Sequence, residues 1–239
     1  MQKEIEQFKS MIESSDNVVF FGGAGVSTES NIPDFRSPDG LFNKKFDIPA
    51  EQILRHSFFL AHPDKYFDFH RTRLTYMNDA MPNKAHLKLA EMEKSGKLKA
   101  VVTQNIDNLH HRAGSENIIE LHGSAFRNYC MKCRKTFPVS HILDCDSVPY
   151  CECGGIVRPD IVMFEEMLNE NTISKAIEYI SKADVLIVGG TSLVVYPAAS
   201  FVNYYRGNKL VLINQSETAF DEKADLVIRS SIGGVLSEI

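Results

Sequence analysis

Four of the five cysteines in this 239-residue sequence fall in two close pairs with the spacing of a metal site. Cys130 and Cys133 form a CxxC pair, and Cys151 and Cys153 form a CxC pair after 17 intervening residues. Four thiolates suit tetrahedral Zn²⁺ and fill its coordination sphere, which leaves no position for water or substrate. We therefore expect one structural zinc ion. Cys145 is an alternative ligand, and unligated clustered thiols are the alternative to a metal site.

A glycine-rich stretch, VVFFGGAGVSTESNIPDFRS at residues 18–37, is the second chemical signal. An apolar run that ends in clustered glycines is typical of a buried strand that leads into a phosphate-binding loop. The dinucleotide fingerprint GxGxxG would need a third glycine where Thr28 stands, and the chain instead continues into Pro-Asp-Phe-Arg at 33–36. The stretch predicts a phosphate loop without the long helix of a Rossmann dehydrogenase.

Polar residues also follow other apolar runs. The run 100–102 is followed by Gln104, Asn105 and Asp107, the run 185–188 by Gly190, Thr191 and Ser192, and the run 210–213 by Asn214. Because the carboxyl ends of strands in a doubly wound sheet converge on one crevice, we expect these residues and the glycine loop to line one site. Polar capping of strand ends is the alternative explanation of each cluster taken alone.

The apolar runs themselves predict the fold class. They are Val18 to Phe21, Ala100 to Val102, Val185 to Val188, Leu210 to Ile213 and Leu226 to Ile228. Helical patterns flank most of them, including residues 85–95 and 171–182, which indicates a parallel sheet covered on both faces. Residues 40–81 lack strand patterns and are predicted to be a helical insertion. Residues 126–157 hold the cysteines and too few apolar residues for their own core, so something other than hydrophobic burial must hold this segment together.

Composition narrows the function classes. A net charge of -5, a pI near 5.9 and the lack of a Lys/Arg block argue against nucleic acid as a partner. The first residues form an amphipathic pattern and not a signal peptide, and no apolar run approaches the roughly 18 residues of a membrane span. Paired cysteines without export signals favour a reducing compartment. We therefore expect a cytoplasmic protein that binds neither nucleic acid nor membrane.

Six motifs in this order closely resemble the sirtuins, NAD-dependent protein lysine deacylases, of the bacterial type. The motifs are GAGVSTESNIPDFRS, TQNIDNLHHRAG, LHGS, the CxxC and CxC module, GTSLVVYPAA and the VLIN run. The resemblance covers nearly the whole chain. It implies an α/β fold in which a Rossmann-like doubly wound parallel sheet carries a smaller domain, made of the helical insertion and the four-cysteine zinc module. The NAD-binding domain is expected to comprise residues 1–39, 82–125 and 158–239. The helical insertion is expected at 40–81 and the zinc-binding module at 126–157.

The resemblance also implies the residues that bind NAD. Small residues of the loop let backbone amides approach the pyrophosphate, the Pro-Asp-Phe-Arg segment covers the nicotinamide end, and amide and carboxylate side chains bind the carboxamide and the ribose hydroxyls. The cofactor-binding residues expected on this basis are Gly22, Ala24, Gly25, Ser27, Thr28, Asp34, Phe35, Arg36, Gln104, Asn105, Ile106, Asp107, His122, Gly190, Thr191, Ser192, Asn214, Gln215 and Ile232.

For the reaction, the resemblance implies His122 as the base and Asn105 as a second catalytic residue. The acyl oxygen of a substrate lysine attacks the ribose carbon as nicotinamide leaves, and His122 then activates a ribose hydroxyl. The products are free lysine, nicotinamide and O-acetyl-ADP-ribose. The acetylated protein or peptide is expected to lie as an added strand between two segments. Its expected contacts are Val162, Met163, Phe164, Leu193, Val194 and Val195.

The chain departs from the family pattern at two positions. Asn31 and Glu165 stand where sirtuins commonly have glycine. Asn tolerates a positive φ, so the first turn is expected to survive. Sirtuins that remove acidic acyl groups carry a Tyr and an Arg three residues apart, and alignment places Phe67 and His70 there. Since neither supplies a fixed cation, we expect a preference for acetyl and other short uncharged acyl groups.

Three rival functions are weighed against deacylation. The first is a Rossmann-like NAD dehydrogenase, but this sequence lacks the complete dinucleotide fingerprint. The second is a zinc-ribbon DNA-binding protein, which the acidic net charge argues against. Protein ADP-ribosylation uses the same cofactor, but His122 favours deacylation. The expected enzyme is a monomer.

Overall fold

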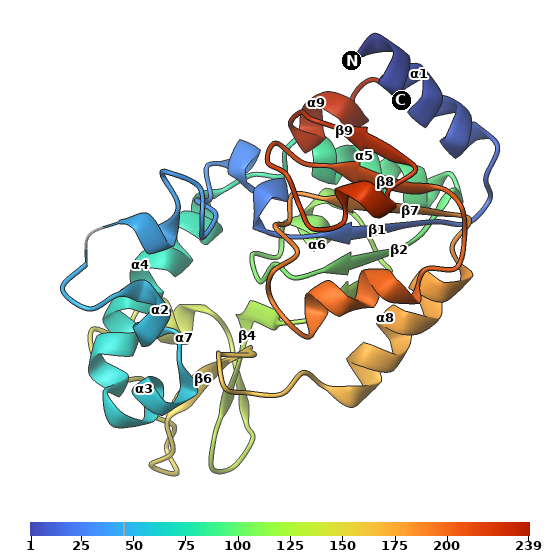
Figure 1. Cartoon of the computed structure of the whole chain (residues 1–239). Helices are drawn as coiled ribbons and strands as arrows, with labels where there is room; N and C mark the ends of the chain where they lie inside the picture. The colour runs from blue at the N-terminus through green and yellow to red at the C-terminus, as the bar shows by residue number, and fades with distance from the viewer. Residues whose placement is uncertain (45) are drawn as a thin grey trace.

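The computed structural model describes residues 1–44 and 46–239 and contains a large parallel sheet with a smaller part beside it (Figure 1). The strands of the large sheet follow the order β3-β2-β1-β7-β8-β9, and neighbours run parallel. They are β1 (Val18–Gly22), β2 (Leu98–Thr103), β3 (Ile118–Glu120), β7 (Val185–Gly189), β8 (Leu210–Ile213) and β9 (Leu226–Ile228). Chain order reverses at β1, which lies between β2 and β7. The predicted α/β class with a doubly wound sheet is confirmed.

Both faces of this sheet are buried, because successive side chains of β1 pack into two different hydrophobic cores. Phe20 packs in one core with α1 (Gln2–Glu13), α5 (Lys84–Lys94) and α9 (Ile232–Leu236). Val19 and Phe21 pack in a second core with α8 (Glu170–Lys182) and the 3-10 helix η4 (Ala198–Tyr204). Successive strand residues point to opposite faces, so an unbroken apolar run satisfies both helical layers. Figure 1 shows these layers above and below the sheet.

The smaller part combines the helical insertion with the cysteine segment. The insertion contains η3 (Leu41–Asn43), α2 (Ala50–Ile53), α3 (His56–Ala61) and α4 (Pro63–Asp79), and the cysteine segment contains β5 (Thr136–Phe137) and α7 (Ser140–Leu143). An antiparallel sheet in the order β5-β4-β6 includes β4 (Gly123–Cys130) and β6 (Val157–Ile161). The predicted boundaries at 125/126 and 157/158 fall inside β4 and β6.

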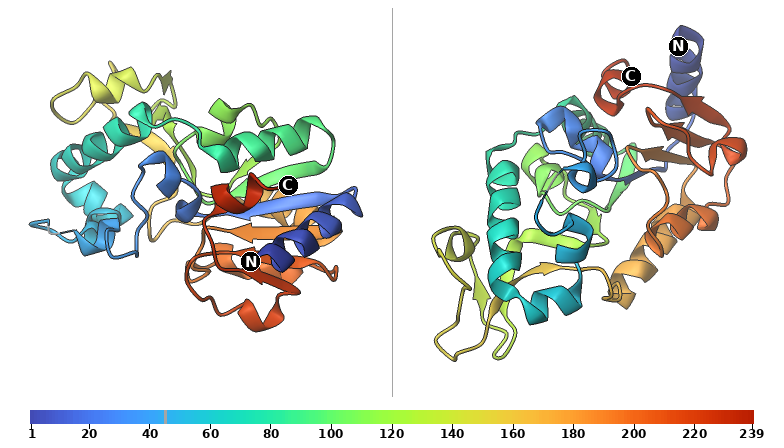
Figure 2. Two further views of the ribbon diagram at one scale, coloured as in Figure 1. Left: turned by 90° about the horizontal axis from the view of Figure 1, so that it is seen from above. Right: turned by 60° about the vertical axis from the view of Figure 1, so that its left-hand side comes forward.

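One hydrophobic core joins these two segments. Phe59, Phe67 and Leu74 of the insertion are fully buried together with Ile142 and Val157 of the cysteine segment. The insertion therefore supplies apolar side chains that the cysteine segment lacks. Figure 2 shows from two further sides that the cysteine segment and the insertion helices lie together, apart from the large sheet.

Several short helices follow or join the strands of the large sheet. The 3-10 helices η1 (Ala24–Val26) and η2 (Thr28–Ser30) follow β1, α6 (Leu109–Ala113) follows β2, and η5 (Asp221–Lys223) precedes β9. The chain leaves the large sheet after β1 and β3 and returns through α5 and α8, so the loops at the carboxyl edge of the sheet face the smaller part. None of the helices in 1–44 and 46–239 has the length and apolar character that crossing a membrane requires.

Candidate active site

A large cleft lies where loops from the carboxyl ends of β1, β2, β7, β8 and β9 meet the smaller part. Its volume is ≈ 1410 Å³, more than the roughly 300–1,000 Å³ typical of a pocket for one small ligand. Most of the predicted cofactor-binding, catalytic and substrate residues line it, namely Ala24, Gly25, Ser27, Thr28, Asp34, Phe35, Arg36, Gln104, Asn105, Ile106, Asp107, His122, Val162, Met163, Phe164, Gly190, Thr191, Ser192, Val195, Asn214, Gln215 and Ile232. Residues from distant parts of the sequence are thus brought into one cavity.

Three predicted residues lie outside this lining in the described structure. Gly22 is the last residue of β1, and its carbonyl oxygen accepts a hydrogen bond from Gln104 N at 3.0 Å. Leu193 is buried beneath the cleft wall, and Val194 is exposed on the surface. Gly22 therefore supports the site through its backbone. Of the three predicted substrate contacts Leu193, Val194 and Val195, Val195 alone lines the cavity in the described structure.

The loop after β1 needs glycine because two backbones approach closely. Gly25 N donates a hydrogen bond to Gly190 O at 2.8 Å, and a Cβ on Gly25 would lie 2.8 Å from Gly190 Cα. The loop then forms η1 and η2 in place of a long helix and ends at Asn31, whose φ of 62° lies in the left-handed region. The prediction that Asn31 preserves this turn is confirmed, as is the absence of a dehydrogenase-type helix directly after the loop.

The predicted cover segment, residues 33–36, follows this loop and lines the cleft. The ring of Phe35 packs on Phe42 at 5.2 Å between centroids, and the guanidinium of Arg36 lies 5.5 Å from the Phe42 ring. Asp34 Oδ1 accepts a hydrogen bond from Ser37 N at 3.0 Å, which closes the turn that follows. Aromatic and cationic side chains are therefore placed at the rim of the cleft.

A buried hydrogen-bond network joins the loop after β1 to the loop after β2. Ser27 Oγ donates to Asp107 Oδ2 at 2.6 Å, and Asn105 Nδ2 donates to Ser27 Oγ at 3.1 Å. Asp107 Oδ1 also accepts from Leu109 N at 3.0 Å, where α6 begins. Burial raises the pKa of Asp107, and the hydrogen bond from Ser27 opposes that rise. The network presents amide and carboxylate groups that suit a carboxamide or sugar hydroxyls.

His122 is oriented by the backbone of the same loop. Its Nδ1 lies 2.9 Å from Gln104 O, and a carbonyl oxygen only accepts hydrogen bonds, so Nδ1 carries the proton and Nε2 the lone pair. Gln104 is itself held because its Nε2 donates to Thr191 Oγ1 at 3.1 Å. Burial lowers the pKa of His122, while the bond to Gln104 raises it. A neutral imidazole with an available lone pair is what a general base requires.

Val162, Met163 and Phe164 follow β6 and form the wall of the cleft opposite Val195. A partly buried ion pair supports this wall, because Arg158 Nη1 and Nη2 bind the two carboxylate oxygens of Glu166 at 2.6 and 2.9 Å. Glu166 Oε2 also accepts from Met163 N at 2.8 Å. The ion pair thereby fixes the backbone of the wall.

The structure adds one cation that the sequence interpretation missed. Phe67 and His70 are buried against Tyr66 in the shared core and do not line the cleft in the described structure, but Arg73, three residues after His70, does. Its guanidinium lies 5.5 Å from the ring of Phe35. Burial lowers the pKa of Arg73. The sequence interpretation looked for a cation only at Phe67 and His70, and it did not consider Arg73. The sequence did offer a signal for Arg73, because a residue three positions after His70 lies on the same face of helix α4.

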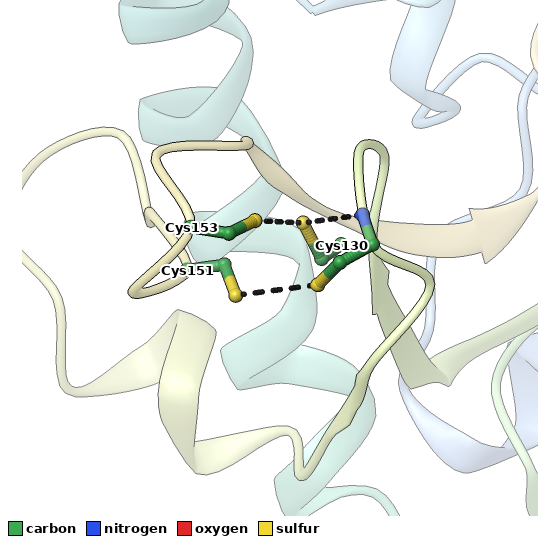
Figure 3. A group of neighbouring side chains, drawn as sticks. Cys130, Cys151 and Cys153 are labelled. Carbon is green, nitrogen blue, oxygen red and sulfur yellow. Dashed lines mark hydrogen bonds between the residues drawn. The ribbon is translucent and has the colours of Figure 1, made fainter.

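The four paired cysteines form the predicted cluster. Their sulfur atoms all lie within 4.8 Å of one another, and the Sγ distances are 3.5 Å for Cys130 to Cys153 and 3.6 Å for Cys133 to Cys151 (Figure 3). Tetrahedral zinc with bonds of about 2.3 Å separates its sulfur ligands by about 3.8 Å, so the geometry fits the ion. Hydrogen bonds from the backbone N–H groups of Cys133 and Lys132 lower the pKa of Cys130 to about 6, which favours the thiolate.

The cysteine cluster and the cleft loops that follow β1, β2 and β7 lie in a part of the chain that matches a known family. The sequence profile of the Sir2 family matches residues 23–197. The chain belongs to the Sir2 family. The resemblance to sirtuins drawn from the six motifs is thus confirmed, and the four-cysteine cluster is consistent with the predicted structural zinc ion.

Individual Sir2 relatives match over the whole chain. The chain is 57% identical over 243 residues to an NAD-dependent protein deacetylase of Clostridium perfringens, which covers 100% of this chain and 99% of the relative. It is 54% identical to the NAD-dependent protein deacetylase of Clostridium acetobutylicum, and the match covers 99% of this chain and 98% of that relative. A solved structure of Sir2 with a p53 peptide and NAD+ is 38% identical, with a TM-score of 0.87 and coverage of 98% of this chain and 95% of that chain.

The same fold occurs in a Sir2 structure that contains a deacetylated p53 peptide and 3'-O-acetyl ADP ribose. That structure is 38% identical, has a TM-score of 0.90 and covers 98% of this chain and 96% of that chain. The likeness therefore extends to both parts of the molecule and to the cleft between them.

Zinc binding is tested by two serine substitutions. Cys145 lies outside the cluster and contacts Ser147 O at 3.4 Å, so Cys145→Ser should retain the zinc of the wild type. Cys153→Ser removes one of four ligands and should lose the metal, together with thermal stability, because the zinc contributes to folding. Metal content by atomic emission and melting temperature check this. Zinc lost from Cys145→Ser and retained in Cys153→Ser would reverse the ligand assignment.

Proposed function

We propose that this Sir2-family chain removes acetyl groups from protein lysines in a reaction that consumes NAD. The observation that carries the proposal is that His122, with its Nε2 lone pair available, lines the same cleft as the glycine loop and the Ser27–Asn105–Asp107 network. Whole-length relatives that are NAD-dependent protein deacetylases support it. The products are nicotinamide, O-acetyl-ADP-ribose and free lysine.

Each part of the cleft has a task in this proposal. The backbone amide of Ala24 binds the pyrophosphate, and Gly25, whose own N–H is bonded to Gly190 O, leaves room for the phosphates because it has no side chain. Asn105 and Asp107 bind the carboxamide and the ribose hydroxyls. When bound, NAD supplies a sugar carbon that is activated by its bond to the nicotinamide ring. His122 Nε2 then takes the proton of a ribose hydroxyl.

The remaining residues cover and shape the site. Phe35 and Arg36 exclude water from the reacting end, which strengthens the electrostatic interactions inside. Asn214, Gln215 and Ile232 bind the far end of the nucleotide. Ile106 walls the nicotinamide pocket.

An acetylated peptide lies against the wall 162–164 and pairs through its backbone, which gives affinity with little demand on its sequence. Sir2 structures with a p53 peptide and with an acetylated peptide support this class of partner. The enzyme acts as a monomer in this proposal, since one chain supplies both walls. Four reduced cysteines fit a cytoplasmic location.

The direct test is incubation of the purified enzyme with NAD and one acetyl-lysine peptide, followed by mass spectrometry. We expect deacetylated peptide, nicotinamide and O-acetyl-ADP-ribose in equal amounts, and no deacetylation without NAD. A peptide heavier by one ADP-ribosyl group would indicate the transferase reaction instead. Formation of NADH would indicate hydride transfer and would contradict the proposal.

The role of His122 predicts the pH dependence. Burial holds the pKa of His122 below its usual value of 6.5, so the imidazole stays neutral above that pH and activity is lost as the pH falls through the lowered pKa. The acid limb of log(kcat/KM) against pH should therefore lie below pH 6.5 and reach unit slope. His122→Ala should abolish this limb and lower kcat by about 100-fold or more while NAD still binds by calorimetry. Unchanged turnover in His122→Ala would remove this residue from the role of base.

A second activity, removal of acidic acyl groups, is favoured by Arg73. This cation lines the cleft, and the described residues give it ring contacts with Phe35 and Phe69 but no carboxylate partner. A succinyl group would supply one. Arg73→Met keeps the length of the side chain and removes its charge, so it should lower kcat/KM for a succinyl-lysine peptide by about tenfold and leave that for an acetyl-lysine peptide within about twofold. An equal effect on both peptides, or no succinyl turnover by the wild type, would exclude this activity.

A further inference from the structure

Glu165, directly after the substrate wall, has an unfavourable backbone conformation. Its φ is 78°, in the left-handed region where glycine is free of strain and most side chains are not. Asn and Asp tolerate this region because short polar side chains bond locally, but glutamate has no such advantage. A glutamate at this position therefore has to be held by interactions of its side chain.

The side chain of Glu165 makes those interactions with the helical insertion. Oε2 accepts a hydrogen bond from Ser57 N at 2.9 Å, and Oε1 accepts one from Ser57 Oγ at 3.1 Å. Arg55 Nη1 lies 3.8 Å from Oε1. The bond from the Ser57 backbone is the main reason that the pKa of Glu165 lies below its ordinary value. The carboxylate is therefore charged at neutral pH and bound at both oxygens.

These bonds satisfy the start of helix α3. The first N–H groups of a helix have no partner within the helix and need acceptors from elsewhere. The N-cap residue Arg55 supplies no side-chain acceptor. His56 N donates instead to Phe164 O at 3.0 Å, and Ser57 N donates to Glu165. A negative charge at this end also suits the helix dipole. Residues 164–165 thus cap α3 from 108 positions away.

The cap is continuous with the wall of the cleft. Phe164 N donates to Leu54 O at 3.1 Å, and Leu54, Phe164 and Glu165 all line the cavity. On the other side of this segment, the Arg158–Glu166 ion pair holds Met163. The wall is therefore attached to the insertion through the backbone of Phe164 and the side chain of Glu165, and to β6 through Glu166. Loss of the Glu165 carboxylate leaves the backbone bonds of Phe164 but removes the acceptor of Ser57 N, so the wall is held to α3 less firmly.

We propose that Glu165 is a positioning residue for the peptide substrate: by capping α3 it fixes Phe164 against the insertion and so sets the edge with which an acyl-lysine peptide pairs. This inference rests on the proposed function and adds a residue that acts only through the wall. The Ser27, Asn105 and Asp107 network lies on the other side of the cleft and does not involve Glu165. Binding of the peptide, and not of NAD, depends on the cap.

Three substitutions separate positioning from folding. Glu165→Ala removes the carboxylate and keeps the strained φ, whereas Glu165→Gly removes both. Glu165→Gln keeps an oxygen that accepts from Ser57 N. Glu222, exposed on η5 and without a hydrogen bond or ion pair to the described residues, provides the matched control Glu222→Ala.

Steady-state kinetics with an acetyl-lysine peptide and NAD give the first readout. KM for the peptide should rise about tenfold in both Glu165→Ala and Glu165→Gly, with KM for NAD within about twofold of the wild type. Glu165→Gln should recover most of the peptide affinity. The glycine variant should melt at a higher temperature than the alanine variant, because glycine relieves the strained φ. If the two variants nevertheless have equal KM values for the peptide, the effect on KM comes from the lost cap and not from lower stability.

Hydrogen exchange of the ligand-free protein gives a second readout that does not depend on activity. Backbone amides of residues 57–61 should exchange faster in Glu165→Ala and Glu165→Gly than in the wild type. In Glu222→Ala their exchange rates should equal those of the wild type. Unchanged exchange together with an unchanged peptide KM in Glu165→Ala would overturn the inference, as would parallel changes in the KM for peptide and for NAD. A wild type that turns over no peptide refutes the proposed function, and the exchange experiment then still decides whether Glu165 caps α3.

Discussion

The hydrogen bond from Ser27 to Asp107 is the constraint on which the candidate site depends. It joins the loop after β1 to the loop after β2, and both side chains are almost fully buried. A carboxylate taken out of water is costly unless it is hydrogen-bonded, so the loops have a strong reason to keep this geometry. Once the two loops are fixed, Asn105 points to Ser27 and Gln104 presents its carbonyl oxygen to His122. His122 and the polar pocket are thus positioned by one small network.

The second requirement is a wall opposite these loops, and the smaller part provides it. The cysteine segment has too few apolar residues to fold alone, and the insertion helices complete its core while the four thiolates provide the metal site. The two walls therefore have different origins. The large sheet fixes the loops through parallel strands that are buried on both faces, whereas the smaller part fixes residues 162–166 through ion pairs and helix capping.

Much of this arrangement was predictable from the sequence because it is encoded locally. Unbroken apolar runs reveal strands buried on both faces, and the polar residues that follow them mark the crevice. The spacing of the cysteines indicates their ligand set. Strand β3 was not predictable, since Ile118, Ile119 and Glu120 are too few to form a pattern. The small sheet was missed because β4 mixes buried and exposed residues irregularly along GSAFRNYC.

The errors within the site come from long-range packing. Arg73 reaches the cleft because α4 packs with Phe67 and His70 turned into the core, and no local pattern gives that rotation. Leu193 and Val194 lie outside the lining because the chain turns at Leu193, whose φ is 53°. The function of Glu165 was equally hidden, because Ser57 lies far away in the sequence and only the fold brings the two together.

The central claim is that one cleft holds the nucleotide and the acyl-lysine at once, with His122 between them. A crystal structure of the enzyme with NAD and an acetyl-lysine peptide tests it most directly. The account predicts the carboxamide of nicotinamide at Asn105 and Asp107, the peptide backbone beside Phe164, and His122 Nε2 within hydrogen-bonding distance of a ribose hydroxyl. A nicotinamide ribose bound away from His122, or a peptide bound outside the cleft, would contradict it.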